Sequence, residues 1–296
     1  VTFTGHTPGS PAYRRLIVGL FFAGIATFAQ LYSPQAVLPQ LSSNLGITPA
    51  TAALAVSAAT LGLAAAVVPW SMVADRMGRV PAMGIGILTA TALGVLAPFS
   101  TGMEMLLALR LLEGVALGAV PAVALAYLSE EVSARDAATA AGSYIAGTTV
   151  GGLLGRVLSG LAGEPWGWRA GIWTVAGVCA VAAVLFLWLT PKAQGFVPGR
   201  FRHDASPRML ARLAMPLRSA TQLALYMQGF LLMGAFVAVY NYLGFHLIDA
   251  PFALPGWVVT LLFLAYLAGT VSSPTAGALA SRFGRYPVLL LSLIHI

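Results

Sequence analysis

Long apolar runs fill almost the whole chain, and short polar stretches separate them. A helix needs roughly 20 mainly apolar residues to cross the hydrocarbon core of a membrane. Eight runs approach that length, at approximately 16–37, 52–73, 81–99, 104–128, 138–161, 169–190, 221–248 and 256–280. The pattern therefore predicts an all-α polytopic membrane protein.

A ninth apolar run begins at Pro287 and stops at Ile296. Ten residues are too few to span a bilayer, so we expect the chain to be cut inside its ninth helix. The last six residues differ from the Ala-, Gly- and Val-rich remainder and suggest a cloning or sequencing artefact.

Composition supports the membrane prediction and excludes several other classes of protein. Hydrophobic residues make up 58% and charged residues 8% of the 296 residues, whereas a soluble domain has about 25% charged residues. The single cysteine, Cys179, allows no disulfide framework and disfavours a thiolate metal site. The chain has no Gly-x-x-x-x-Gly-Lys-Ser/Thr loop for ATP and no Cys/His spacing for zinc. We therefore expect neither an enzyme nor a bound cofactor or metal.

Basic residues predict the orientation. With the N-terminus inside, thirteen of the sixteen Lys and Arg residues fall on the cytoplasmic side, as the positive-inside rule requires. This bias accounts for the net charge of +7 without nucleic acid as a partner. A signal peptide over residues 1–37 is the rival interpretation, but the apolar run is too long and no small-x-small cleavage site follows it.

One long polar segment divides the chain. It covers 191–220 and carries six basic residues and one acid. We expect an N-terminal six-helix half at 1–190, a cytoplasmic basic linker at 191–220 and an incomplete C-terminal half at 221–296. Residues 209–217 are also compatible with an amphipathic helix on the anionic inner leaflet, although we prefer a solvated linker.

A short charged loop occurs twice. The first copy is Asp75-Arg76-Met77-Gly78-Arg79, and the second, which starts 206 residues later, is Ser281-Arg282-Phe283-Gly284-Arg285. The arginines suit the negative end of the preceding helix, and glycine permits a left-handed turn. Both copies fall on the same predicted side, which indicates two parallel repeats.

The two loops resemble the signature of the major facilitator superfamily, Gly-x-Leu-Ala-Asp-Arg-x-Gly-Arg, found between helices 2 and 3 and more weakly between helices 8 and 9. Ser71 replaces the first Gly, and Ser281 replaces Asp in the second copy. The resemblance implies the first eight helices of a twelve-helix transporter with two six-helix halves. It also implies a gate latch that stabilises the outward-facing state, formed by Asp75, Arg76, Gly78 and Arg79 and, in the second copy, Arg282, Gly284 and Arg285. The simpler alternative is a topology signal with a tight turn.

Two charges lie inside the fourth predicted span. Burying a charge in the membrane costs about 3 kcal/mol on insertion scales, so such charges are usually functional. Arg110 and Glu113 are three residues apart and share a helix face. The run resembles the family motif Arg-x-x-x-Gly, which is associated with proton coupling. We expect Glu113 to carry the proton and Arg110 to tune its affinity; a structural salt bridge is the alternative.

The fifth predicted span contains a glycine strip. Gly147, Gly151 and Gly155 recur every four residues and favour close helix contact. The run resembles the antiporter motif Gly-x-x-x-Gly-Pro-x-x-Gly-Gly of the drug-efflux branch, with Gly152 in place of Pro and Arg156 in place of the last Gly. Arg156 is a second buried cation that either compensates Glu113 or binds an anionic substrate. Packing alone is the alternative role of the glycines.

By the same resemblance, helices 1, 4, 7 and 10 line a central cavity, and the polar residues of helices 1 and 7 become candidates for it: Gln30, Tyr32, Gln228 and Asn241. Tyr32 is equally compatible with a position at the external interface.

These observations predict a secondary active transporter that moves a small organic molecule by alternating access. Proton-coupled efflux is the preferred mode. The rivals are an uptake symporter or facilitator, and a non-transporting sensor or scaffold. We expect a monomer in the plasma (inner) membrane, with a small-molecule substrate, protons and the lipid bilayer as its partners. A chain without most of the second half is expected to be inactive.

Overall fold

The computed structural model describes residues 5–133, 135–196 and 218–268, together with residues 279, 282–284 and 287. These residues are helical apart from turns and one isolated backbone pairing between His6 and Val132. Most of the predicted linker and the predicted ninth helix lie outside the described residues.

The first predicted span is longer than its apolar run. Helix α1 covers Pro11–Tyr32, and the turn η1 at Gln35–Val37 leads into α2 at Leu38–Leu45. The side chain of Ser10 caps α1 by accepting a hydrogen bond from the Tyr13 amide at 3.2 Å. α1 ends just before Pro34, which has no N–H to continue the helix.

The next two spans begin where the sequence supplies helix-starting residues. α3 covers Pro49–Met77, with Thr48 as its cap and Pro49 at its first position. α4 covers Arg79–Leu96 and continues into η2 at Ala97–Phe99.

The predicted run at 104–128 is interrupted in the structure. α5 covers Met103–Leu117 and α6 covers Pro121–Glu131. The interruption precedes Pro121, whose ring and missing N–H favour the first turn of a new helix over the interior of an old one. Together the two helices still form one membrane-length segment, at 103–131.

Two predicted spans are joined in α7, Ala137–Leu189. Gly167, with φ 83° and ψ 163°, breaks the helical geometry within it. Glycine adopts this positive φ without the steric penalty of a Cβ atom. The two arms on either side correspond to the runs predicted at 138–161 and 169–190, and each is long enough to cross a membrane.

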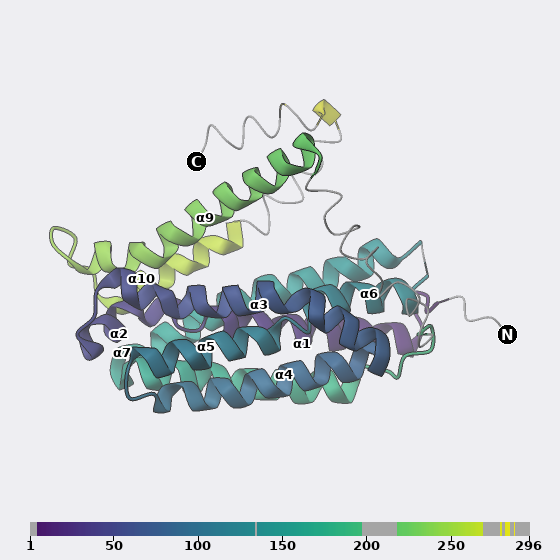
Figure 1. Ribbon diagram of the computed structural model, residues 1–296, viewed down its shortest axis with the longest axis horizontal. Helices are drawn as coiled ribbons and strands as arrows, with labels where there is room; N and C mark the ends of the chain where they lie inside the picture. The colour runs from purple at the N-terminus through teal and green to yellow at the C-terminus, as the bar shows by residue number, and fades with distance from the viewer. Residues whose placement is uncertain are drawn as a thin grey trace.

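The C-terminal part begins with α9, Ala220–Ile248, which Ser219 caps. α10 at Gly256–Leu261 and η5 at Leu262–Ala265 follow, where the eighth run was predicted to begin. Figure 1 shows α9 near the bundle where it meets α2 and α10, and further from it toward the end at which the N-terminus lies.

The outer surface of the bundle is apolar. Large hydrophobic side chains such as Leu61, Val184 and Trp188 are 66%, 63% and 70% exposed. Contact with lipid accounts for such a surface, because lipid tails are as apolar as these side chains. The six membrane-length helical segments found in the described part of the chain agree with it.

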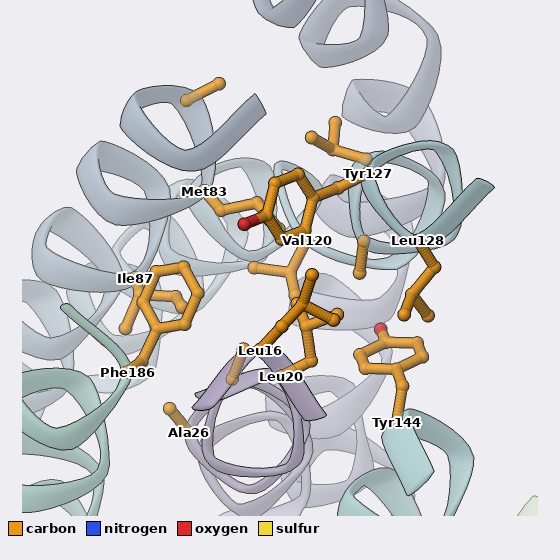
Figure 2. Packing of buried hydrophobic residues seen from close by; sticks show 14 of the residues in the cluster. Leu16, Leu20, Ala26, Met83, Ile87, Val120, Tyr127, Leu128, Tyr144 and Phe186 are labelled. Atoms are coloured by element: carbon orange, nitrogen blue, oxygen red, sulfur yellow. The ribbon is translucent and has the colours of Figure 1, made fainter. Parts of the chain in front are cut away.

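The largest buried cluster joins α1, α4, α6 and α7. Figure 2 shows Leu16 and Leu20 of α1 facing Tyr127 of α6, Met83 of α4 and Phe186 of α7. Lipid tails are as apolar as these side chains, so moving the side chains out of lipid gives no hydrophobic driving force. Close van der Waals packing therefore stabilises this contact. The Tyr127 hydroxyl donates to the Pro191 carbonyl at 2.8 Å, which ties α6 to the segment after α7.

Candidate functional site

A buried ion pair lies in α5. The side chains of Arg110 and Glu113 are both 0% exposed, and Nη1 of Arg110 lies 2.6 Å from Oε2 of Glu113. The two residues are one helical turn apart, so α5 itself presents both charges to the same neighbours. Pairing offsets part of the desolvation cost that each charge would bear alone.

Backbone carbonyls of two other helices complete the arginine's hydrogen bonds. Arg110 donates from Nη1 to Gln30 O at 3.1 Å, from Nη2 to Leu31 O at 2.6 Å, and from Nε to Ala55 O at 3.0 Å. The local sequence makes this possible, because Gln30 O would normally accept from the amide of residue 34, and Pro34 has none. The end of α1 thereby becomes a docking point for Arg110.

The second oxygen of Glu113 has no such partner. Oε1 of Glu113 and Oε1 of Gln30 are buried and have no well-formed hydrogen bond, although the Gln30 side chain also interacts with the Glu113 carboxylate. Gln30 uses its other amide atom, Nε2, to donate to Ala90 O of α4 at 2.5 Å. Gly94 lies beside both side chains, since a Cβ there would be 3.2 Å from Glu113 Oε1 and 3.1 Å from Gln30 Cδ. Glu113 Oε1 therefore lies in a small buried space beside the amide nitrogen of Gln30.

The glycine strip of α7 packs against α1 with backbone contact. A Cβ built on Gly151 would lie 2.7 Å from the Cα of Ile25, and one on Gly155 would lie 2.8 Å from the Cα of Ala29. Gly147 approaches α1 equally closely one turn earlier. The interval of four residues is the same on both helices, as expected for a small-residue crossing. This contact brings Arg156, at the end of the strip, against the end of α1.

Arg156 is 2% exposed and carries its own set of contacts. Its Nε donates to Gln35 Oε1 at 2.5 Å, and its Nη1 donates to Gly152 O at 2.7 Å. Its guanidinium lies over the rings of Tyr32 and Tyr266, at 3.9 and 4.5 Å from their centres. Arg110, and not Arg156, forms the ion pair with Glu113.

A polar bridge joins the two predicted halves. Gln35 Nε2 donates to Asn241 Oδ1 at 2.5 Å, and both residues are buried. Gln35 and Asn241 are 206 residues apart, the same interval that separates the two copies of the charged loop. This shared interval is the one expected for equivalent positions of the predicted repeat.

Contacts between α7 and the C-terminal part form three layers along one face of α7, at the end where α2 and α10 lie. The layers are spaced by one turn and consist of Glu164 with Gly256, Gly160 with Thr260, and Arg156 with Phe263 and Tyr266. A cavity of about 460 Å³ adjoins the first two layers and is also lined by Ser43, Phe245 and Asp249. The layer that contains Arg156 is the innermost of the three.

The charges of the first loop gather around Arg79, which is 4% exposed. Its Nη1 lies 2.5 Å from Asp75 Oδ1 and its Nη2 lies 2.7 Å from Glu130 Oε1 at the end of α6. Phe196 adds an aromatic face, with its ring centre 5.5 Å from the guanidinium carbon. Arg76, by contrast, is exposed. The described contacts of the predicted latch therefore join α3, α4, α6 and the segment after α7.

The two copies of the loop share a backbone feature. Gly78 and Gly284 have φ values of 102° and 91°, which residues other than glycine rarely adopt. A proline follows each glycine at the third position, Pro81 and Pro287. Arg282 lies over the ring of Phe283 at 5.3 Å, whereas Arg285 is outside the described residues. The repeat thus extends to backbone conformation.

Glu131, a buried carboxylate next to Glu130, was not predicted from the sequence. It is 0% exposed and accepts hydrogen bonds from the amides of Gln194 and Gly195 at 2.7 and 2.6 Å. His6 Nε2 lies 3.8 Å away. Glu131 therefore fastens the end of α6 to the segment after α7. No group of three or more His, Cys, Asp or Glu side chains suited to a metal is found within the described ranges.

Comparison with known proteins decides the family. The family model described as Major Facilitator Superfamily matches residues 20–296. The chain belongs to the major facilitator superfamily. It is 38% identical over 285 residues to the Inner membrane transport protein YnfM of Escherichia coli (strain K12), which covers 96% of this chain and 67% of that protein. It is 33% identical to the Uncharacterized MFS-type transporter YybF of Bacillus subtilis (strain 168), over 97% of this chain and 70% of that protein.

A solved structure shows the same fold. The nucleoside transporter NupG (D323A mutant) superposes with a TM-score of 0.69 at 17% identity, over 91% of this chain and 69% of that chain. The chain thus spans about two thirds of the length of the relatives it matches. It is an integral membrane transporter of the major facilitator type, and the predicted fold class is confirmed.

Membership of the family does not show where the predicted cavity residues lie, but the structure does. Of the four predicted cavity residues, Gln30 joins the Arg110 network, while Tyr32 and Asn241 surround Arg156 through ring contact and through Gln35. Gln228 lies on the same helix as Asn241 but thirteen residues away, about 20 Å along α9. It therefore stands apart from both clusters in this structure.

The Arg79 cluster leads to a prediction about gating. If the latch stabilises the outward-facing state, Asp75→Asn should slow labelling of a cysteine placed at Ser43, which lines the cavity of about 460 Å³ on the side predicted to be external. The reason is that Arg79 loses one of its two carboxylate partners and the latch weakens. The measurement is the rate of reaction with a membrane-impermeant maleimide. Cys179 is buried and should contribute little background.

Arg135→Gln is the matched control, because it removes an exposed charge from another loop on the predicted cytoplasmic side. Labelling at Ser43 should be unchanged in this control. Equal labelling rates in Asp75→Asn and in the unaltered protein would count against a latch.

Proposed function

We propose that this transporter exports a small organic molecule in exchange for protons, by alternating access between the two sides of the inner membrane. The observation that carries the proposal is the buried pair of Arg110 and Glu113, held against the end of α1. An intramembrane carboxylate is costly to retain without a function. Its position between three helices also lets its protonation state affect how those helices pack.

The unpartnered oxygens suggest how a proton would be sensed. With Glu113 ionised, its Oε1 and the Oε1 of Gln30 are both acceptors without a well-formed hydrogen bond. A proton on Glu113 Oε1 would add an O–H donor beside the Gln30 side chain, while Oε2 keeps its contact with Arg110. Because Gln30 also holds Ala90 of α4, protonation would favour close packing of α1, α4 and α5. Deprotonation would loosen that packing.

Alternating access requires a contact between the halves that opens and closes. The layers of α7 with α10 and the bridge of Gln35 with Asn241 join the halves at one end of the bundle. α9 runs away from the bundle toward the other end (Figure 1). With the N-terminus inside, this arrangement is closed to the outside. Opening would separate the bridge and the layers, with the latch around Arg79 biasing the balance.

Everted membrane vesicles that contain the transporter with a complete second half test the proposed direction of transport. A growth screen in a strain without its own exporters first identifies a compound to which expression gives resistance. Respiration then acidifies the vesicle lumen, and a proton antiporter for efflux should accumulate that radiolabelled compound in the lumen. A protonophore should abolish the accumulation.

The rival functions predict other outcomes. An uptake symporter would accumulate the compound in right-side-out vesicles instead. A facilitator would equilibrate it in both preparations regardless of the protonophore. A sensor or scaffold would move no compound in either preparation, and any of these three results would overturn efflux antiport.

A further inference from the structure

Arg156 is a buried cation without a carboxylate partner in the described part of the chain. The sequence has nine acidic residues, and Asp204 alone lies outside the described residues. None of the other eight lies within 4.0 Å of the Arg156 guanidinium, whereas Arg79 and Arg110 each have an acidic partner. A buried charge is expensive unless it is paired and hydrogen-bonded. The position therefore suits a negatively charged group that none of the described residues supplies.

Arg156 and Tyr266 have hydrogen-bond donors available for such a group. The hydrogen bonds of Arg156 to Gln35 and Gly152 occupy two of the five N–H groups of its guanidinium. The hydroxyl of Tyr266 is buried, lacks a hydrogen-bond partner and belongs to a ring 4.5 Å from the guanidinium carbon. A planar fork of N–H donors with a nearby O–H donor matches the two oxygens of a carboxylate.

The surroundings of the cation are aromatic. We define the aromatic cluster as Tyr32, Phe236, Tyr240, Phe263 and Tyr266. The ring of Tyr240 lies 5.0 Å from that of Tyr266 and 5.6 Å from that of Phe263. Phe236 lies 5.4 Å from Tyr266 and is 40% exposed, so the cluster is not closed on that side. Such a surface favours an aromatic ligand, since rings stack on rings.

The cluster also lies at the junction of the halves. Arg156 and Tyr32 belong to α7 and α1, whereas Phe236 and Tyr240 belong to α9 and Phe263 to η5. A ligand bound there would contact both parts of the transporter and would be carried between the two states. Ligand sites of transporters with repeated halves lie at such a junction.

We propose that Arg156 and the aromatic cluster bind the carboxylate and the ring of the transported molecule, which is an aryl carboxylate. The proposal rests on the proposed transport function and names its substrate class. A carboxylate on the remaining N–H groups of Arg156 would draw the guanidinium toward itself and weaken its hydrogen bond to Gln35 Oε1. Gln35 also holds Asn241, so binding would loosen the bridge between the halves at the step where they must separate. Substrate binding is thereby coupled to opening.

Thermal unfolding and calorimetry of the purified transporter in a neutral detergent, free of anionic lipid, test this assignment. The probes are benzoate, 2-naphthoate and indole-3-acetate, each compared with its primary amide. At least one carboxylate should raise the unfolding temperature more than its amide does. Arg156→Gln should weaken binding of that carboxylate at least tenfold and leave the binding of the amide unchanged. Arg169→Gln, an arginine of the same helix that bonds to Pro98, Ser100 and Asn44, is the matched control and should retain the preference.

Tyr266→Phe provides a second variant in case Arg156→Gln fails to fold. It removes a single hydroxyl, and it should weaken carboxylate binding while leaving amide binding unchanged. The assignment would be overturned if no carboxylate is preferred over its amide, or if the preference survives unchanged in both variants. If anionic lipid binds at this position instead, the transporter should be more stable in anionic than in zwitterionic nanodiscs, and Arg156→Gln should remove this difference. If aryl carboxylates do not compete with that lipid, a substrate role for the site is overturned.

The outcomes separate this inference from the proposed function. Proton-driven export of a neutral compound that is unaffected by Arg156→Gln would overturn the inference and support the function. A carboxylate that binds at Arg156 and moves without any effect of a pH gradient would support the site and overturn proton coupling.

Discussion

Glu113→Gln should abolish substrate flux driven by an imposed pH gradient while leaving substrate exchange at equal pH. The amide keeps the shape of the carboxylate and an acceptor for Arg110, but it cannot bind and release a proton. Pure exchange needs only that the binding site changes sides, which requires no net proton movement. The measurement is the uptake of radiolabelled substrate into proteoliposomes, once with a pH gradient and once with unlabelled substrate inside.

Glu104→Gln is the matched control, because Glu104 is an exposed carboxylate in the first turn of the same helix. Gradient-driven flux should persist in this control. If Glu113→Gln retains gradient-driven flux, Glu113 is not the proton carrier. If it instead loses exchange and thermal stability together, the pair with Arg110 acts as a structural salt bridge, because an unpaired buried arginine is strongly destabilising.

Gly155→Ala should lower the unfolding temperature of the transporter by several degrees, although alanine is the better helix former. The added Cβ would lie 2.8 Å from the Cα of Ala29, and backbone atoms of α1 cannot give way as a flexible side chain would. Overpacking of this kind costs about 1–3 kcal/mol. It would also displace the end of α1, which carries the carbonyls that hold Arg110. We therefore expect transport to fall as well.

Gly177→Ala is the matched control within the same helix. A Cβ at Gly177 would meet nothing within 4 Å. The same substitution should be neutral or slightly stabilising there, by up to about 1 kcal/mol, since alanine has the higher helix propensity. Scanning fluorimetry of both variants measures the difference. A Gly155→Ala protein as stable as Gly177→Ala would contradict the close contact of α1 with α7.

Local patterns in the sequence predicted much of the fold. Run length alone located the first seven spans, and the helical spacing of Arg110 and Glu113 predicted that they share a face. The repeated loop predicted a left-handed turn at Gly78; the structure has a positive φ there, with an extended ψ of 154°, and a positive φ at Gly284 as well. The break at Gly167 falls between the runs predicted at 138–161 and 169–190. The break before Pro121 was not predicted, because the apolar run at 104–128 conceals it. Pro121 was the indication in the sequence of the break between α5 and α6.

Local sequence patterns could not predict contacts between distant segments. Nothing near Arg79 in the sequence indicates that Glu130 is its second partner. Likewise, Arg156 was recognised as a buried cation, but its aromatic neighbour Tyr266 lies on another helix more than a hundred residues later. Such pairs depend on how helices pack against one another. The bridge of Gln35 with Asn241 is different, because its interval of 206 residues equals that of the repeat. Matching the two halves position by position would have suggested it.

If substrate leaves in exchange for protons, the pH inside proteoliposomes reports the exchange most directly. Proteoliposomes containing the transporter, pyranine and the identified substrate are diluted into substrate-free buffer at equal pH, with valinomycin and potassium holding the membrane potential at zero. As substrate leaves, antiport predicts that protons enter and the lumen acidifies, and that Glu113→Gln abolishes the change. An alkaline shift, or an unchanged lumen while substrate escapes, would contradict the account.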